Sequence, residues 1–168
     1  TFSPGERLYT LVNHELVHTV VGDQASTEDM QARHWLGGKV VAVPEHPESI
    51  LYNYLTNPRA SSPRWYQEGS AVFMETWYGG GLGRAQGGYD EMVFRAMVRD
   101  DADFYDPLGL VSKGTEVDFQ TGANAYLYGT RFLSYLALEY SPEKLIDWLR
   151  RADGTERDQL ALQVLCRR

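Results

Sequence analysis

Two histidines near the beginning of the chain stand four residues apart, and a glutamate follows the first of them. Residues 14–18 read His-Glu-Leu-Val-His. Positions i and i+4 of an α-helix lie on one face, so the imidazoles of His14 and His18 can both reach one metal ion. Zn²⁺ binds imidazole nitrogen at about 2.0–2.1 Å, and catalytic zinc sites keep one coordination position open. Glu15 lies beside a ligand, where its carboxylate can take a proton from a zinc-bound water.

A catalytic zinc site needs a third protein ligand, for which His34 and Glu68 are the candidates. A metzincin site is excluded, because it needs glycine three residues and histidine six residues after His18. This chain has Val21 and Gln24 at those two positions. His34 belongs to a separate expected helix, and no pattern supports it as a ligand.

The segment around Glu68 resembles a known family. Residues 65–75 read Trp-Tyr-Gln-Glu-Gly-Ser-Ala-Val-Phe-Met-Glu. They look like the second zinc helix of the gluzincin metallopeptidases, especially the aminopeptidase-N-like branch, whose signature is W-x-x-E-G-x-A with a further glutamate seven residues after the ligand. The resemblance implies that Glu68 binds zinc and that Gly69 keeps the helix clear beside the site. Glu75 either orients a ligand histidine or is a solvated helix carboxylate.

The interval between His18 and Glu68 is longer than in the aminopeptidase-N-like enzymes. In this respect the chain resembles the related peptidase-MA-like domains of bacterial proteins, which carry longer intervals. Residues 44–63, which are rich in proline, lie within this interval.

A third segment supports the same resemblance. Residues 126–129 read Tyr-Leu-Tyr-Gly, and in the aminopeptidase-like branch a Y-x-x-G segment begins a helix downstream of the glutamate ligand. The resemblance implies that the Tyr126 hydroxyl stabilises the oxyanion of the reaction, a task that suits a neutral hydrogen-bond donor. The alternative role for Tyr126 is that of a buried or interfacial aromatic residue, and Tyr128 is a neighbour with which it is easily confused.

Apolar spacing and turn residues predict a mainly α fold with little sheet. The best strand candidate is residues 39–43 (Lys-Val-Val-Ala-Val). Residues 79–88 are rich in glycine and either border the cleft or form a plain connector. Residues 101–122 are expected to be loop. Helices are expected at residues 5–21, 26–36 (with Ser26 or Thr27 as the cap), 48–55, 64–77, 89–99, 123–140 and 142–152, with a further helical segment after 155.

The resemblance implies a zincin-like (gluzincin) helical catalytic domain, or a truncated α+β domain. Gluzincin peptidases usually place a β-sheet before the zinc helix, and its edge strand binds the substrate by backbone pairing. Few residues precede His14, so the sheet is expected to lie in an absent upstream region, to be replaced by residues 39–43, or not to exist. The family motif that holds a substrate's free amine is not found, so exopeptidase action is not supported.

Composition limits the remaining choices. The chain has 168 residues, 43% of them hydrophobic, and a net charge of −7. We expect one domain, residues 1–168, and a piece of a longer chain, because residue 1 is Thr rather than Met. The negative charge argues against nucleic acid as a partner, and no apolar run is long enough to span a membrane. The one cysteine, Cys166, does not indicate a cellular compartment. Only the resemblance favours an extracytoplasmic setting. The sequence does not predict the oligomeric state.

The sequence therefore supports three hypotheses. The first is a zinc metallopeptidase acting on a peptide or protein substrate, with Zn²⁺ held by His14, His18 and Glu68 and with Glu15 as the general base. The second is a catalytically inactive zinc-binding helical module that serves as an interaction domain of a larger protein. The third is a helical domain whose His-Glu-Leu-Val-His segment is accidental.

Overall fold

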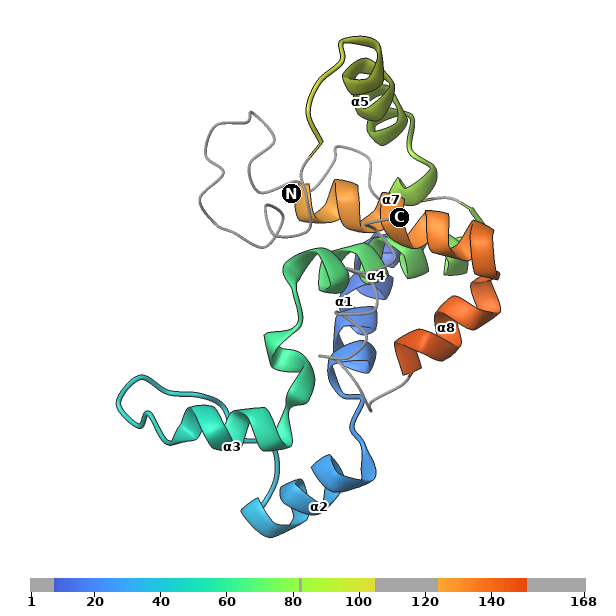
Figure 1. Cartoon of the computed structure of the whole chain (residues 1–168). Helices are drawn as coiled ribbons and strands as arrows, with labels where there is room; N and C mark the ends of the chain where they lie inside the picture. Colours follow the sequence, from blue (N-terminus) through green and yellow to red (C-terminus); the bar gives the residue numbers. More distant parts are fainter. Residues whose placement is uncertain (1–7, 82, 105–123, 151–168) are drawn as a thin grey trace. The chain divides into compact units, whose positions relative to one another are not determined.

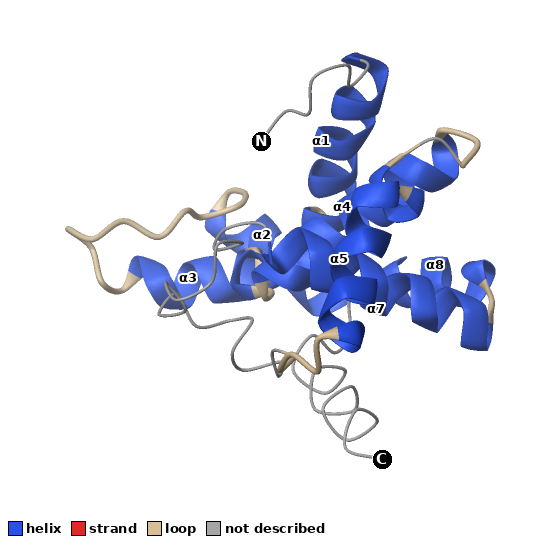
Figure 2. Cartoon of the chain, turned by 90° about the horizontal axis from the view of Figure 1, so that it is seen from above, coloured by secondary structure: helices blue, strands red, loops and turns tan. Residues whose placement is uncertain are grey.

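The computed structural model describes residues 8–81, 83–104 and 124–150, which are mainly helical (Figure 1). Figure 2 shows helices and loops and no strand in these ranges. The prediction of a mainly α chain is therefore confirmed. The elements are α1 (Leu8–Gly22), α2 (Thr27–Leu36), α3 (Ser49–Thr56), the 3-10 helix η1 (Pro58–Ser61), α4 (Arg64–Tyr78), the 3-10 helix η2 (Arg84–Gln86), α5 (Gly88–Arg99), α7 (Asn124–Tyr140) and α8 (Pro142–Arg150).

Each expected helix is present, with bounds that differ by one or a few residues from the prediction. The start of α2 shows why local sequence sufficed. The Ser26 hydroxyl accepts a hydrogen bond from the Asp29 N–H at 3.2 Å, and the Asp29 carboxylate accepts one from the Ser26 N–H at 2.8 Å. This reciprocal pair satisfies two otherwise free donors. Most of the loop predicted at residues 101–122 lies outside the described residues. The helical segment predicted after residue 155 lies wholly outside them.

The predicted strand at residues 39–43 is wrong. The segment has no partner strand in the described ranges, and Val43 forms only an isolated bridge with His46. Side chains of α3 bind its backbone instead. The Val40 N–H donates to Thr56 Oγ1 at 2.9 Å, and Asn53 Nδ2 donates to the Val40 carbonyl at 2.7 Å. Because polar side chains satisfy part of its backbone, the segment needs no partner strand for those groups.

Helices that could cross a bilayer are absent from the described ranges: none of them is both long enough and apolar enough.

The chain divides into two compact units. One comprises Thr1–His18 and Pro63–Ile146, and the other comprises Thr19–Ser62 and Asp147–Arg168. In the second unit, Arg33 on α2 donates to the Thr56 carbonyl at the end of α3 at 2.7 Å, and the Thr56 side chain is fully buried. All the residues of the candidate site belong to the first unit.

The core of the first unit is the contact between α4 and α7, which lie against each other (Figure 1). Ten of the residues of α4 are buried, on nearly every side of the helix. From α7, Leu133 is fully buried and Phe132 meets Trp65 edge to face at 5.6 Å between ring centroids. A helix buried all round must be surrounded by other elements, so α4 is the centre of this unit.

Two glycines allow α4 and α7 to approach closely. A methyl group on Gly69 would lie 2.5 Å from the carbonyl carbon of Gly129 and 2.7 Å from its Cα. A methyl group on Gly129 would collide with the Trp65 carbonyl oxygen and lie 3.0 Å from the Gly69 Cα. The obstacles are backbone atoms, which cannot turn aside as a flexible side chain can. The two helices therefore cross at a point where neither can carry a side chain.

We expect Gly129→Ala to lower the free energy of unfolding by about 1–3 kcal/mol, because the added methyl overpacks the crossing. The intrinsic helix propensity of alanine acts in the opposite direction by up to about 1 kcal/mol. Thermal and urea unfolding measure the change. Gly88→Ala is the matched control, because nothing lies within 4 Å of a methyl group at that helical position. Equal stability of the two variants would contradict the close crossing.

Candidate metal centre

Three side chains from α1 and α4 bring their ligand atoms together. His14 and His18 lie one turn apart on α1, with 3.1 Å between their Nε2 atoms. Glu68 on α4 places Oε2 3.4 Å from His14 Nε2 and 3.3 Å from His18 Nε2. The two imidazole planes stand at 85° to each other. The structure thus unites the three residues that the sequence predicted as metal ligands, and these atoms form a nearly equilateral triangle.

The triangle fits one face of a tetrahedral site. For ligand distances of about 2.0–2.1 Å, tetrahedral geometry separates two ligand atoms by roughly 3.3–3.4 Å. The observed separations of 3.1, 3.3 and 3.4 Å match this spacing. In addition, Glu68 Oε2 is buried and has no hydrogen-bond partner among the described residues. A buried carboxylate oxygen without a partner is unfavourable, and a bound cation would satisfy it.

Glu75 fixes the orientation of His14. The glutamate is 1% exposed, and its Oε2 accepts a hydrogen bond from His14 Nδ1 at 2.8 Å. With the hydrogen on Nδ1, the lone pair of the neutral imidazole lies on Nε2, the atom that faces His18 and Glu68. Of the two roles that the sequence left open for Glu75, the structure shows the contact with a ligand histidine rather than the solvated carboxylate.

Arg84 neutralises Glu75, and the sequence reasoning missed it. Its Nε donates to Glu75 Oε1 at 3.0 Å and its Nη2 donates to Oε2 at 3.0 Å. Nη2 also lies 3.0 Å from His14 Nδ1, but a guanidinium can only donate and the protonated Nδ1 also donates, so the hydrogen bond goes to the carboxylate. A two-point guanidinium–carboxylate pair is the strongest pairing available to a buried carboxylate.

The glycine-rich segment after α4 places Arg84. A methyl group on Gly83 would collide with Thr76 Oγ1 and lie 2.7 Å from the Thr76 Cα. The Thr76 hydroxyl also accepts a hydrogen bond from the Ala85 N–H at 3.1 Å, and the Thr76 carbonyl accepts one from the Gly81 N–H at 2.9 Å. The segment is thus fastened to the end of α4 and borders the candidate site. The sequence held one indication of the role of Arg84, because it is the only charged residue between Glu75 and Asp90.

Tyr126 from α7 covers the cluster. Its ring lies 6.2 Å from the His14 ring at an angle of 20°, and the guanidinium carbon of Arg84 lies 5.3 Å from its centroid. Burial and the Glu68 carboxylate beside it raise the pKa of the Tyr126 hydroxyl, so the hydroxyl keeps its proton at neutral pH. Arg64 interacts with the same hydroxyl. The predicted site tyrosine is therefore a half-buried aromatic residue and also a neighbour of the ligand atoms.

Glu15, the predicted general base, follows His14 on α1 with an exposed side chain, and it is not one of the three residues whose ligand atoms converge. His34, the alternative third ligand, lies on α2, where its ring meets that of Trp35 at 6.4 Å. The described cluster has Glu68 in the third position.

Opposite charges balance within the cluster. Burial opposes protonation of His14, but the nearby Glu68 carboxylate and the hydrogen bond to Glu75 outweigh it and raise the pKa of His14 to about 9. Burial likewise opposes ionisation of Glu68, but His14, His18 and the Tyr126 hydroxyl hold its pKa well below the usual range. For Glu75, burial is outweighed by His14 and Arg84, so its pKa is also lowered. In the absence of metal the two carboxylates are therefore ionised and His14 carries a proton at neutral pH.

Comparisons with known proteins identify no relative: no protein-family model matches the chain, and neither the curated proteins nor the solved structures contain a significant match.

In the absence of metal, we expect the protein to lose stability as the pH rises from about 6.5 to about 9. A histidine whose pKa is raised from 6.5 to about 9 stabilises the folded state fully below 6.5, and this contribution is lost as the pH passes the higher value. The loss amounts to at most about 3.4 kcal/mol. Chelator-treated protein unfolded in urea at several pH values provides the measurement.

Two histidine variants serve as controls for this pH dependence. His14→Gln removes the titrating group and should flatten the profile. His46→Gln changes an exposed histidine, whose side chain is 68% accessible, and should leave the profile as in the wild type. A flat wild-type profile would contradict the charged pairing of His14 with the two glutamates.

Proposed function

We propose that the chain is a zinc-dependent peptide hydrolase of the gluzincin type, in which His14, His18 and Glu68 hold the metal. The observation that carries the proposal is the triangle of three ligand atoms at 3.1, 3.3 and 3.4 Å, which includes a buried carboxylate oxygen with no hydrogen-bond partner in the described ranges. The donor set of two imidazoles and one carboxylate is typical of catalytic zinc in peptidases.

Bound zinc would supply Lewis acidity, which activates a water molecule and polarises the scissile carbonyl. The residues of the chain have the remaining tasks. Glu75 and Arg84 keep His14 in the tautomer whose Nε2 lone pair is available. Glu15 accepts a proton from the attacking water and delivers it to the leaving amine. Its exposed side chain on α1 is next to a ligand in sequence, and a bound substrate would shield it from solvent.

Tyr126 is suited to stabilise negative charge on the substrate. Its hydroxyl remains protonated at neutral pH, because burial and Glu68 raise its pKa. A neutral donor that is held in place by neighbouring rings can direct a hydrogen bond at the carbonyl oxygen as this oxygen gains charge. The stacking of Tyr126 on His14 and its contact with Arg84 restrict the ring.

The second candidate function is a zinc-binding helical module without catalytic activity. The observation that favours it is the absence of a β-strand in the described ranges, so these residues offer no sheet edge for pairing with an extended peptide. The two candidates share the metal site and differ in turnover. The third hypothesis, an accidental motif, differs from both in binding no zinc.

We expect wild-type protein to contain about one zinc ion per chain, and Glu68→Ala to contain far less. Removal of one of three protein ligands from a zinc site weakens binding strongly, because the remaining two leave the coordination incomplete. Elemental analysis of the two proteins purified side by side measures the content. Glu143→Ala is the matched control, since it removes an exposed carboxylate on α8. Equal zinc in Glu68→Ala and wild type would refute the ligand set.

We expect Glu15→Gln to keep its zinc and to lose activity by about 10²–10⁴-fold, the usual contribution of a general base. Hydrolysis of a broad peptide library, followed by mass spectrometry, measures turnover. Glu28→Gln on α2 is the control for the loss of one charge. A Glu15→Gln variant as active as the wild type would exclude the mechanism. Zinc binding without cleavage in the wild type would favour the interaction module.

A further inference from the structure

A cavity of about 260 Å³ adjoins the candidate metal centre. Two elements, η2 and α7, contribute residues to both sites. Arg84 of η2 bonds Glu75 beside His14, while the next residues of η2 line the cavity. On α7, Tyr126 contacts the His14 ring, and Thr130, one turn further on the same face, lines the cavity. The remaining wall comes from α5, including Asp90, Glu91 and Phe94.

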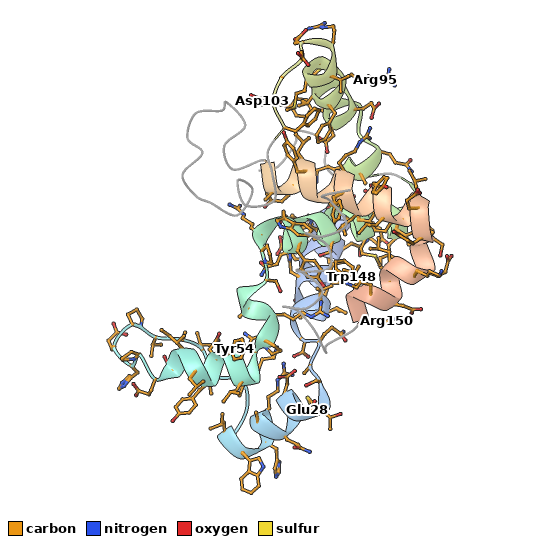
Figure 3. The ribbon with its side chains drawn as sticks, viewed as in Figure 1. Glu28, Tyr54, Arg95, Asp103, Trp148 and Arg150 are labelled. Carbon is orange, nitrogen blue, oxygen red and sulfur yellow. The ribbon has the colours of Figure 1, made fainter. Side chains whose placement is uncertain are left out.

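The cavity has an excess negative charge. Among its charged lining residues, Glu91 pairs with Arg131 at 2.9 Å, and Arg131 also lies 5.6 Å from the Phe94 centroid. Arg95, which projects from the exposed side of α5 (Figure 3), bonds the other carboxylate oxygen of Glu91 at 2.8 Å. Asp90 has neither a hydrogen bond nor an ion pair within the described part of the chain, and burial raises the pKa of its carboxyl. It is therefore a partly desolvated carboxylate with no direct salt bridge, which Arg84 and Arg131 attract only from a greater distance.

A second, independent polar group in this cavity lacks a partner. Thr130 is 3% exposed, and its hydroxyl has no hydrogen-bond partner among the described residues. Buried hydroxyl groups are usually paired, because an unpaired one loses its hydrogen bonds to water and gains none. The hydroxyl thus requires a partner as the Asp90 carboxylate does, and both residues line one cavity.

Size and chemistry together define the occupant. The cavity is smaller than the roughly 300–1,000 Å³ of sites for whole small molecules, so it suits a single side chain. Phe94 and Leu127 provide apolar surface for a methylene stem. The Asp90 carboxylate and the Thr130 hydroxyl accept hydrogen bonds from a charged head group, and a carboxylate pairs with a guanidinium through two parallel hydrogen bonds.

We propose that this cavity binds a basic side chain, arginine or lysine, of the peptide substrate, and that it selects the residue placed beside the metal centre. The selection of a substrate rests on the proposed function, whereas the binding of a cation does not. Asp90 and Thr130 are then binding residues that determine specificity. Arg84 forms its two-point ion pair with Glu75 and makes no salt bridge with Asp90, on which its charge acts only from a distance.

The probe is Nα-acetyl-arginine amide, compared with Nα-acetyl-citrulline amide, which has the same length and no charge. Binding to the full chain is followed by NMR titration, with and without added zinc. We expect the arginine compound to bind about tenfold more tightly than the citrulline compound. Asp90→Asn should abolish this preference. Asp100→Asn removes an exposed carboxylate that follows the same helix and pairs with Arg99, and it should retain the preference. Equal binding of the two compounds by the wild type, or an undiminished preference in Asp90→Asn, would overturn the proposal.

Thr130→Val gives a second test, because it replaces the hydroxyl by a methyl group of the same shape. We expect affinity for the arginine compound to fall about threefold or more, while the melting temperature stays the same or rises because a buried unpaired hydroxyl is removed. A purely structural role for Thr130 would instead lower the melting temperature and leave binding unchanged.

Cleavage of two peptides that differ only in arginine or citrulline separates this proposal from the proposed function. Binding that depends on Asp90, without any cleavage, would support the cation pocket and contradict the proposed hydrolase function. Cleavage of both peptides at equal rates, with equal binding of the two amides, would leave the hydrolase and remove the pocket.

Discussion

The contact between Gly69 and Gly129 is the constraint on which the candidate site depends. Glu68 directly precedes the first glycine, and Tyr126 lies one turn before the second. Since the two backbones touch where neither residue has a side chain, the glutamate and the tyrosine meet beside the same histidine. Glycine in a helix interior lowers intrinsic stability, so both glycines have a structural reason to be there. The two segments that resemble gluzincin signatures are thus joined by a direct contact between their glycines.

A network of ionisable side chains lies beside this crossing. The imidazole of His14 bonds Glu75, and Glu75 bonds Arg84, which stacks against Tyr126. Each charge has an opposite partner, which limits the desolvation penalty of placing several ionisable groups in the core. The arrangement also holds three ligand atoms close together before any cation binds. Preorganisation of this kind reduces the entropy that is lost on binding.

Local chemistry accounts for what was predictable from the sequence. Apolar spacing and the Ser26 cap predicted the helices, and the i, i+4 spacing of His14 and His18 predicted that they share one face of a helix. Glu68 was predicted only from the resemblance of its segment to the gluzincin zinc helix. The strand prediction for residues 39–43 failed because β-propensity does not reveal whether a partner strand exists, and Asn53 and Thr56 bind that backbone instead. Arg84 was missed because its position depends on the path of a glycine-rich loop, which composition alone does not specify. The pairing of Gly69 with Gly129 is likewise invisible until two distant segments are placed together.

The separation of His18 and Glu68 along the chain has a topological consequence. Residues 19–62 leave the first unit directly after one ligand and return to it shortly before another. A cation shared by the two would close this segment into a loop, as a disulfide does. Doubling the length of such a loop changes the closure entropy by only about 0.6 kcal/mol. The segment can therefore lengthen, shorten or be replaced at little thermodynamic expense, while the ligands at its two ends keep their geometry. A cation bound by His14, His18 and Glu68 would thus join the two ends of residues 19–62, and the stability of such a cross-link would depend little on the length of the segment between them.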